Sequence, residues 1–185
     1  MKQMNRKKTA GMSAEQEFLK LSAQKLRQLN ERILVCLEKL TQDQIWLRGG
    51  ENENAVGNLC LHLAGNVRQW IGYGVAGQED LRVRDLEFSA RGGRSTAELR
   101  VLLAETVEPA AVVIERLKPE ALMFETRIQN YDVTVLSAIY HVVEHFAQHT
   151  GQILFATKAL TGEDLGFYAH LSQGKSQPSP AGQQP

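Results

Sequence analysis

The sequence has few of the features that would cross-link a fold or anchor it in a bilayer. Cys36 and Cys60 are its only cysteines, and both fall within apolar helical patterns. That usage is typical of free thiols in a reducing compartment and argues against a disulfide framework. No stretch approaches the roughly 18 consecutive apolar residues of a membrane-spanning helix. Near the N-terminus, polar residues follow the basic ones where a secretion signal would be apolar. These absences predict a soluble, cytoplasmic protein.

An excess of charge of either sign is also missing. Lysine plus arginine number 21, as do aspartate plus glutamate, so no overall field favours nucleic acid or an acidic membrane. A recognisable DNA-binding motif is missing as well. Hydrophobic residues make up 43% of the chain and charged residues 23%, which is usual for a globular protein. The length of 185 residues then predicts one domain that buries its own core.

Apolar residues recur with helical spacing in four segments. We predict helices over residues 14–40, 55–75, 96–117 and 133–160. Ser13 with Gln16 forms a capping box before the first helix, and Ser95 with Glu98 forms another before the third. Pro109 should kink the third helix. The apolar residues of these segments form long stripes, which are typical of helices that pack against other helices.

The segments between and beyond these helices complete the predicted organisation. The charged stretch 78–94 reads as a long irregular crossover on the surface, and alternation over 124–128 predicts a short extended piece. Residues 1–13 are expected to be a basic, flexible N-terminus and residues 172–185 a disordered tail. Residues 14–171 are then predicted to form an all-α four-helix bundle with a long crossover connection, an architecture in which metal sites form between facing helices.

The histidines of the last predicted helix carry the strongest chemical signal. His141, His145 and His149 recur every fourth residue, so adjacent imidazoles lie one turn apart on one face and can chelate an ion. The outer two are about 12 Å apart at 1.5 Å per residue, too far to share it. A helical wheel places His145 and His149 at the edge of the buried stripe and turns His141 further out. We therefore predict the inner pair as ligands, with His141 beside the site or in solvent.

His62 lies in a polar stripe of the second predicted helix, beside that helix's apolar stripe. If the second and last helices pack as neighbours, His62 becomes a third ligand. Three neutral imidazoles suit zinc, nickel or ferrous iron and leave a coordination position open. The rest of the polar stripe is either a cavity wall or a solvated helix face. A single histidine such as His170 is more often solvated or hydrogen-bonded than a ligand. The other members of the stripe are Asn58, Asn66, Gln69 and Tyr73.

Two segments resemble signatures of the DinB-like superfamily. Around His62, ENAVGNLCLHLAGN (residues 53–66) followed by RQWI (68–71) is similar to its second-helix signature. HVVEHFAQHTGQI (residues 141–153) is similar to its last-helix motif, in which two histidines four apart precede a glycine. Over roughly residues 14–171 the resemblance implies a four-helix bundle with a long crossover, a homodimer, and a metal held by His62, His145 and His149. Thr150 stands where many relatives have arginine, so substrate contacts there do not carry over.

The resemblance also implies an activity. The superfamily is similar to bacterial thiol-dependent transferases, in which a metal activates a low-molecular-weight thiol for attack on an electrophile. The expected function is a metal-dependent thiol transferase or hydrolase of a small substrate, with zinc or nickel as the foremost metals and iron as a further candidate. The alternative is a non-catalytic metal-binding or stress-related protein. DNA binding, associated with the superfamily's name, is opposed by the balanced charge.

Overall fold

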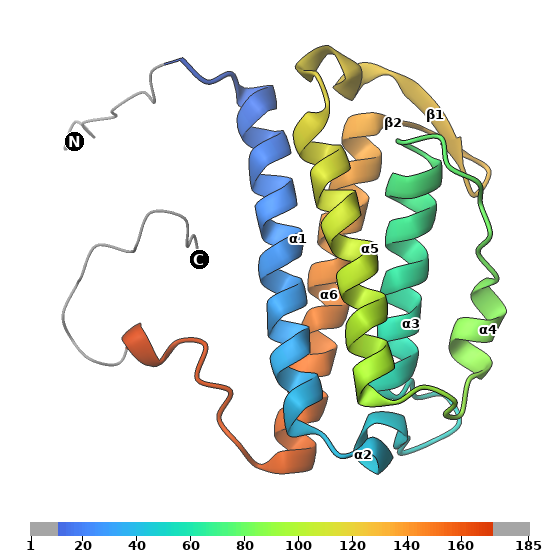
Figure 1. Cartoon of the computed structure of the whole chain (residues 1–185), viewed down its shortest axis with the longest axis vertical. Coiled ribbons are helices and arrows are strands. Elements are labelled where there is room, and N and C mark those ends of the chain that lie inside the picture. The colour runs from blue at the N-terminus through green and yellow to red at the C-terminus, as the bar shows by residue number, and fades with distance from the viewer. Residues whose placement is uncertain (1–10, 172–185) are drawn as a thin grey trace.

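A computed structural model describes residues 11–171 and shows four long helices packed as a bundle (Figure 1). They lie close to their predicted positions, and the all-α bundle is confirmed. Most of the predicted N-terminal arm and all of the predicted tail, residues 172–185, lie outside the described residues. The long helices are α1 (Ala14–Lys39), α3 (Val56–Val67), α5 (Thr96–Arg116) and α6 (Val135–Thr161), and a π-helical segment, η1 (Arg68–Tyr73), continues α3.

Both predicted capping boxes are present at the starts of α1 and α5. The Ser13 hydroxyl accepts the backbone N–H of Gln16, and the Gln16 side chain accepts the N–H of Ser13 in return. Ser95 and Glu98 make the same exchange. Such reciprocal bonds satisfy N–H groups that a helix leaves free at its first turn. Residue Pro109 lies inside α5, which continues through it as one helix.

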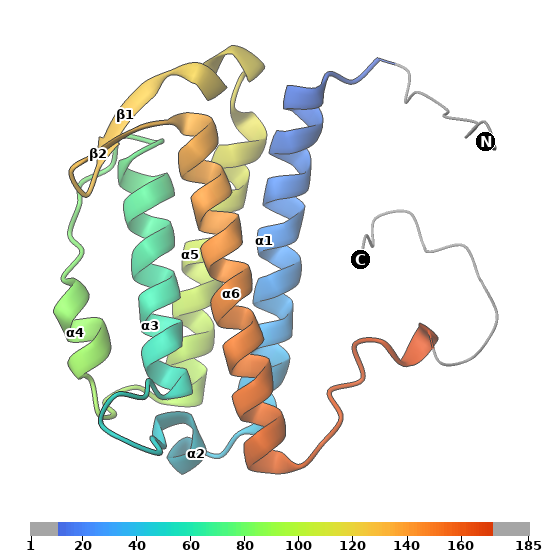
Figure 2. The ribbon, with the colours of Figure 1, turned by 180° about the vertical axis from the view of Figure 1, so that it is seen from behind.

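The four helices form a square in which each contacts two neighbours. α1 packs against α5 and α6, and α3 packs against the same two helices. Figures 1 and 2 show that α3 and α5 run in the same direction, so the chain must return along the bundle between them. The predicted long crossover is therefore confirmed. Since α3 and α6 are neighbours, the arrangement also meets the condition for His62 to face the last helix.

The crossover is more ordered than the sequence suggested. It carries a short helix, α4 (Arg84–Ser89), that packs against α3. The prediction of an irregular surface connection over 78–94 was wrong for this part. Its buried face is formed by Glu87, a carboxylate, while the apolar Leu86 is 65% exposed. The usual pattern of apolar residues facing the core was missing, so hydrophobic periodicity gave no sign of the helix.

Two further elements close the ends of the bundle. α2 (Gln42–Trp46), which the sequence analysis missed, begins with a capping box of Thr41 and Gln44 and places its Trp46 ring against Gly57. At the other end, β1 (Glu125–Ile128) pairs antiparallel with β2 (Tyr131–Thr134). Gln129 and Asn130 form their turn with φ of 51° and 69°, as a two-residue hairpin requires. The extended piece was predicted, but its pairing was not. Short 3-10 segments, η2 (Pro119–Met123) and η3 (Ala169–Leu171), follow α5 and α6 respectively.

One apolar core runs between the four helices. Its largest fully buried side chains include Phe146 of α6 and Leu63 of α3, and each sits one residue from a histidine of the predicted site. Cys36 and Cys60 are buried and free. Within residues 11–171, no helix combines the length and the apolar character needed to cross a bilayer. The core therefore fixes the neighbouring faces of α3 and α6 on which the histidines lie.

Candidate metal centre

The structure brings together the three histidines proposed as ligands. His62 comes from α3, and His145 and His149 lie one turn apart on α6. The Nε2 atom of His145 is 3.0 Å from that of His62 and 3.2 Å from that of His149. Within the described residues these side chains form a group that could hold a metal ion, with one donor atom of each inside 4.8 Å of the others. The ring nitrogens therefore converge on one point between two helices.

The spacing of the three nitrogens fits a shared ion. Zinc binds imidazole nitrogen at about 2.0–2.1 Å, and tetrahedral angles then separate two nitrogens by roughly 3.3 Å. The observed separations at His145 are within a few tenths of an ångström of that value. Hydrogen bonds alone would satisfy the three rings less well. A neutral imidazole has one N–H group, whereas Nε2 of His145 faces the Nε2 atoms of both other rings. The donor set is thus suited to a divalent transition metal.

Burial keeps the imidazoles of His145 and His149 neutral. Desolvation, with the neighbouring histidines and Arg82 adding to it, lowers the pKa of His145 to about 3. Desolvation also lowers the pKa of His149, although the hydrogen bond to Gln152 opposes it. A metal ligand must be unprotonated, so these groups are ready to bind an ion near neutral pH.

The outer ring nitrogens of the three histidines have different partners. His62 Nδ1 lies 2.9 Å from Oε2 of Glu87, and both side chains are buried. His149 Nδ1 lies 2.6 Å from Oε1 of Gln152 on the same helix. His145 Nδ1 is buried and has no hydrogen-bond partner among the described residues. With the outer nitrogens directed away, each ring presents Nε2 to the shared point.

Glu87 is the residue of the site that sequence reasoning missed. It comes from α4 in the crossover and accepts two hydrogen bonds from Arg82, each of 2.8 Å. Burial by itself raises the pKa of Glu87, but the bonds from Arg82 and His62 outweigh it and leave the pKa below its usual value. A carboxylate is therefore held beside His62. The sequence offered one hint, because Gly65, one turn after His62, leaves the space that this carboxylate fills.

Comparison with known proteins assigns the chain to a family. A family model described as "Protein of unknown function (DUF1572)" matches residues 13–175. The chain belongs to this family. No curated protein matches it. The solved structures that share its fold include two at 18% sequence identity each: a conserved protein from Enterococcus faecalis (TM-score 0.68) and a DinB-like protein, YjoA, from Bacillus subtilis (TM-score 0.61). The alignments cover 83% and 80% of this chain, and 100% and 97% of those chains. The DinB-like resemblance is thus confirmed for the fold.

His141 of this DUF1572 member lies beside the triad and outside the ligand group. Its ring is 4.0 Å from that of Trp70, centroid to centroid, and its Nε2 is 3.3 Å from Nδ2 of Asn66. It is half-buried, and desolvation lowers its pKa. Of the two positions expected for His141, the one beside the site is therefore observed. Asn66 Oδ1 and Trp70 Nε1 are buried without hydrogen-bond partners in the described part of the chain.

The other residues of the predicted polar stripe are spread over different surroundings. Asn58 is fully buried, and its amide donates to the carbonyls of Glu87 and Ala90, which ties α3 to the crossover. Gln69 bonds with residues of the crossover and the hairpin turn, including Arg82. Tyr73 is 39% exposed. The stripe therefore serves largely as the surface on which the crossover packs.

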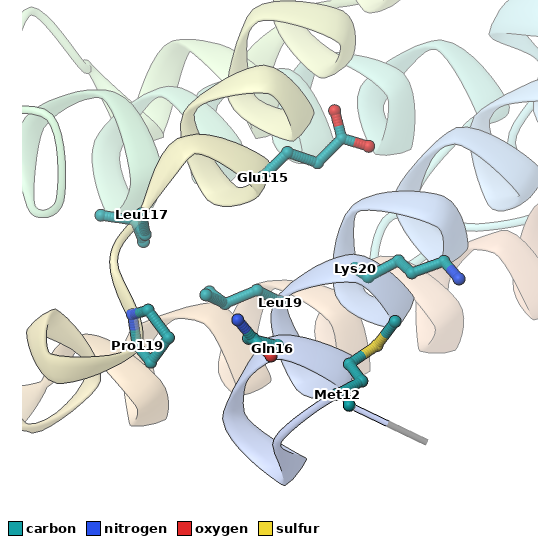
Figure 3. Close-up of a pocket in the computed structure, with 8 residues that line it drawn as sticks. Met12, Gln16, Leu19, Lys20, Glu115, Leu117 and Pro119 are labelled. Atoms are coloured by element: carbon teal, nitrogen blue, oxygen red, sulfur yellow. The ribbon is translucent and has the colours of Figure 1, made fainter. Parts of the chain in front are cut away.

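A pocket elsewhere on the molecule lies away from this centre. Figure 3 shows it between the start of α1 and the end of α5, with Leu19, Lys20, Glu115 and Pro119 among its lining residues. The histidine triad lies between α3 and α6, on the opposite side of the four-helix square. The lining of the pocket is mixed in character and contains no histidine or cysteine. In this DUF1572 chain the residues suited to a transition metal therefore lie at the triad and not in this pocket.

Proposed function

We propose that this protein binds one divalent transition ion on His62, His145 and His149 and uses the remaining coordination position to activate a small thiol or water. The observation that carries the proposal is the convergence of three Nε2 atoms from two helices. Three neutral nitrogens without a thiolate suit zinc or nickel, and iron is a further candidate. A site with three protein ligands is typical of catalytic metal centres, whereas four are typical of structural ones.

The chemistry proposed is a thiol transfer to an electrophile or a hydrolysis, in either case of a small substrate. When bound, a divalent ion lowers the pKa of a coordinated thiol or water, so that the anion exists near neutral pH. Imidazole binds a metal as an uncharged ligand, so three histidines would leave the positive charge of the ion undiminished. Half-buried His141 stands one turn before His145 and is available to contact a substrate.

The attacking thiol would come from solution, because the protein's own cysteines are unsuited to the task. Burial raises the pKa of Cys60 to about 12 and also raises that of Cys36. The thiolate is the reactive form, so thiols with raised pKa values are poor nucleophiles at neutral pH. A low-molecular-weight thiol is the partner that this arrangement favours.

A non-catalytic metal-binding role is the second candidate. The ion would join α3 to α6, and through Glu87 the crossover would be held to the same centre. Such a link between three segments stabilises a fold even without turnover. The two roles differ in whether solutes reach the ion.

We further propose that the protein works as a cytoplasmic homodimer. Free buried cysteines suit a reducing compartment. Tyr140 and Phe155 on α6 are 63% and 76% exposed, and a second copy could cover either of them. Light scattering that gives the mass of one chain, 20.6 kDa, at micromolar concentration would contradict the dimer.

A thiol panel tests the proposed activity. Protein loaded with zinc or nickel should conjugate at least one low-molecular-weight thiol to an electrophilic test substrate, or hydrolyse a test ester or amide. The metal-free protein and the His145→Ala variant should do neither, whereas a Cys36→Ala, Cys60→Ala double variant should retain the activity. A loaded protein that turns over no thiol and no hydrolysable substrate would favour the non-catalytic role.

A further inference from the structure

The carboxylate of Glu87 is buried between α4 and α3, directly behind His62. Resting on the proposed metal-binding function, we infer that Glu87 is a positioning residue of this centre. Its carboxylate accepts a hydrogen bond from the Nδ1–H of His62. This bond fixes both the orientation of the ring and the tautomer in which Nε2 is free to bind an ion. Carboxylates that hold metal-ligating histidines in this way tune affinity in many metal sites.

Glu87 forms a buried ion pair with Arg82 and also contacts the His62 ring. Oε2 lies 2.9 Å from His62 Nδ1, and both carboxylate oxygens accept from Arg82 at 2.8 Å. The side chains of His62, Arg82 and Glu87 are 7%, 3% and 9% exposed. A carboxylate buried this deeply is costly without partners, and it is retained here with its oxygens paired to the ring and the guanidinium.

The arrangement of donors decides where the His62 proton lies. A guanidinium can only donate, and an ionised carboxylate can only accept. Arg82 Nη2 lies 3.1 Å from His62 Nδ1, but it also has a shorter contact, 2.8 Å, with Glu87 Oε2. His62 Nδ1 faces that same oxygen at 2.9 Å. With a proton on Nδ1 the ring donates to the carboxylate; without it, two acceptors would face each other across a buried contact. The Nδ1–H tautomer is therefore favoured, and it leaves the Nε2 lone pair for the ion.

The surrounding residues fit this role and hold Glu87 in place. A Cβ on Gly65 would lie 1.9 Å from Glu87 Oε1, so the carboxylate occupies space that only glycine leaves. Asn58 donates to the backbone carbonyl of Glu87 and anchors α4 on α3. The Phe88 ring packs on the His62 ring at 4.6 Å between centroids. The His62 ring is thus held by both a hydrogen bond to a carboxylate and a ring contact from one short helix.

The other two ligands lack an equivalent partner. His149 has the neutral amide of Gln152, on an exposed side chain, and His145 Nδ1 has no partner within the described residues. Glu87 therefore supplies the one carboxylate that contacts an outer nitrogen of the triad in residues 11–171. Its loss should reduce metal affinity more than the loss of any other non-ligand contact to the three rings.

Two measurements on the full chain test the inference. The first is the imidazole ¹⁵N spectrum of the metal-free protein at a pH where its histidines are neutral, which should show His62 as the Nδ1–H tautomer. The second is zinc affinity by competition with a chromophoric chelator. Glu87→Gln should weaken binding by about 10- to 100-fold. Glu108→Gln is the matched control, because Glu108 is also paired with an arginine, Arg27, but is exposed and remote. It should bind zinc like the wild type.

The outcomes separate this inference from the proposed function. If the wild type binds zinc but Glu87→Gln binds it equally well, Glu87 has no positioning role. An Nε2–H tautomer of His62 in the wild type would also overturn the inference, and this result does not depend on any variant folding. If the wild type binds no zinc, nickel or iron, the proposed function fails, while the tautomer still decides whether Glu87 orients the ring.

Discussion

The Nε2 atoms of His62 and His145 lie 3.0 Å apart, although the two residues are separated by 83 positions in the sequence. The antiparallel packing of α3 against α6 brings them together, and His149, one turn beyond His145, completes the group. A donor set that spans two helices makes metal binding dependent on the fold and makes the fold sensitive to the state of the ligands.

The stability of the metal-free protein should fall as the pH is lowered below about 6.5. The pKa of His145 is about 3 in the folded chain because of burial, against an ordinary value of 6.5. Between these values the unfolded chain binds more protons, so the free energy of unfolding decreases as the pH falls through this window. Thermal melts of chelator-treated protein from pH 7.5 to 5 should show a falling Tm, and His145→Gln should flatten the trend. A wild-type Tm that is constant or rises on acidification contradicts the burial of a neutral His145.

Two glycine substitutions within helices should differ in their effect on stability. At Gly65 an added methyl group would meet Glu87 Oε1 at 1.9 Å, whereas at Gly151, on the exposed face of α6, it would meet nothing within 4 Å. Gly65→Ala should therefore destabilise the protein by about 1–3 kcal/mol. Gly151→Ala should be neutral or stabilising by up to about 1 kcal/mol, because alanine is the better helix former.

Urea denaturation of the two variants provides the measurement. In addition, Gly65→Ala should weaken zinc binding, since the displaced carboxylate no longer holds His62. Equal stability of the two variants would show that Glu87 does not pack against α3 as described.

Neither cysteine should react readily with a thiol reagent in the native state. Cys36 and Cys60 are both buried, and desolvation raises both pKa values. A chromogenic disulfide reagent at pH 8 should modify them only on the timescale of unfolding, and both should react at once in denaturant. Rapid modification of either thiol in the folded protein would reopen the question of an internal nucleophile.

Much of the fold could be predicted because its signals are local. The capping boxes at Ser13 and Ser95 and the apolar spacing of α1, α5 and α6 are properties of short segments, and the structure reproduces them. Gly162, in the left-handed conformation with φ of 70°, ends α6, and glycine just past a helix is itself a local stop signal. These elements depend on propensity and periodicity, which are readable in a single sequence.

The parts that escaped prediction depend on contacts between distant segments. α4 buries a charged residue, Glu87, which becomes favourable only when Arg82 and His62 are beside it. The second strand of the hairpin exists because it pairs with the first. For the site, the helix spacing identified His145 and His149, and the polar stripe identified His62. The carboxylate behind His62 is identified by the tertiary structure, and Gly65 was the one hint of it in the sequence.

The most direct measurement of the central claim is the metal content of untagged protein, by elemental analysis, for the wild type and single histidine variants. We expect about one transition-metal ion per chain in the wild type. His62→Ala, His145→Ala and His149→Ala should each lose most of it. The exposed His170 in η3 provides the control, and His170→Ala should retain the full content. Full occupancy in the His62→Ala variant, or no metal in the wild type after growth with zinc, nickel and iron, would contradict the three-histidine centre.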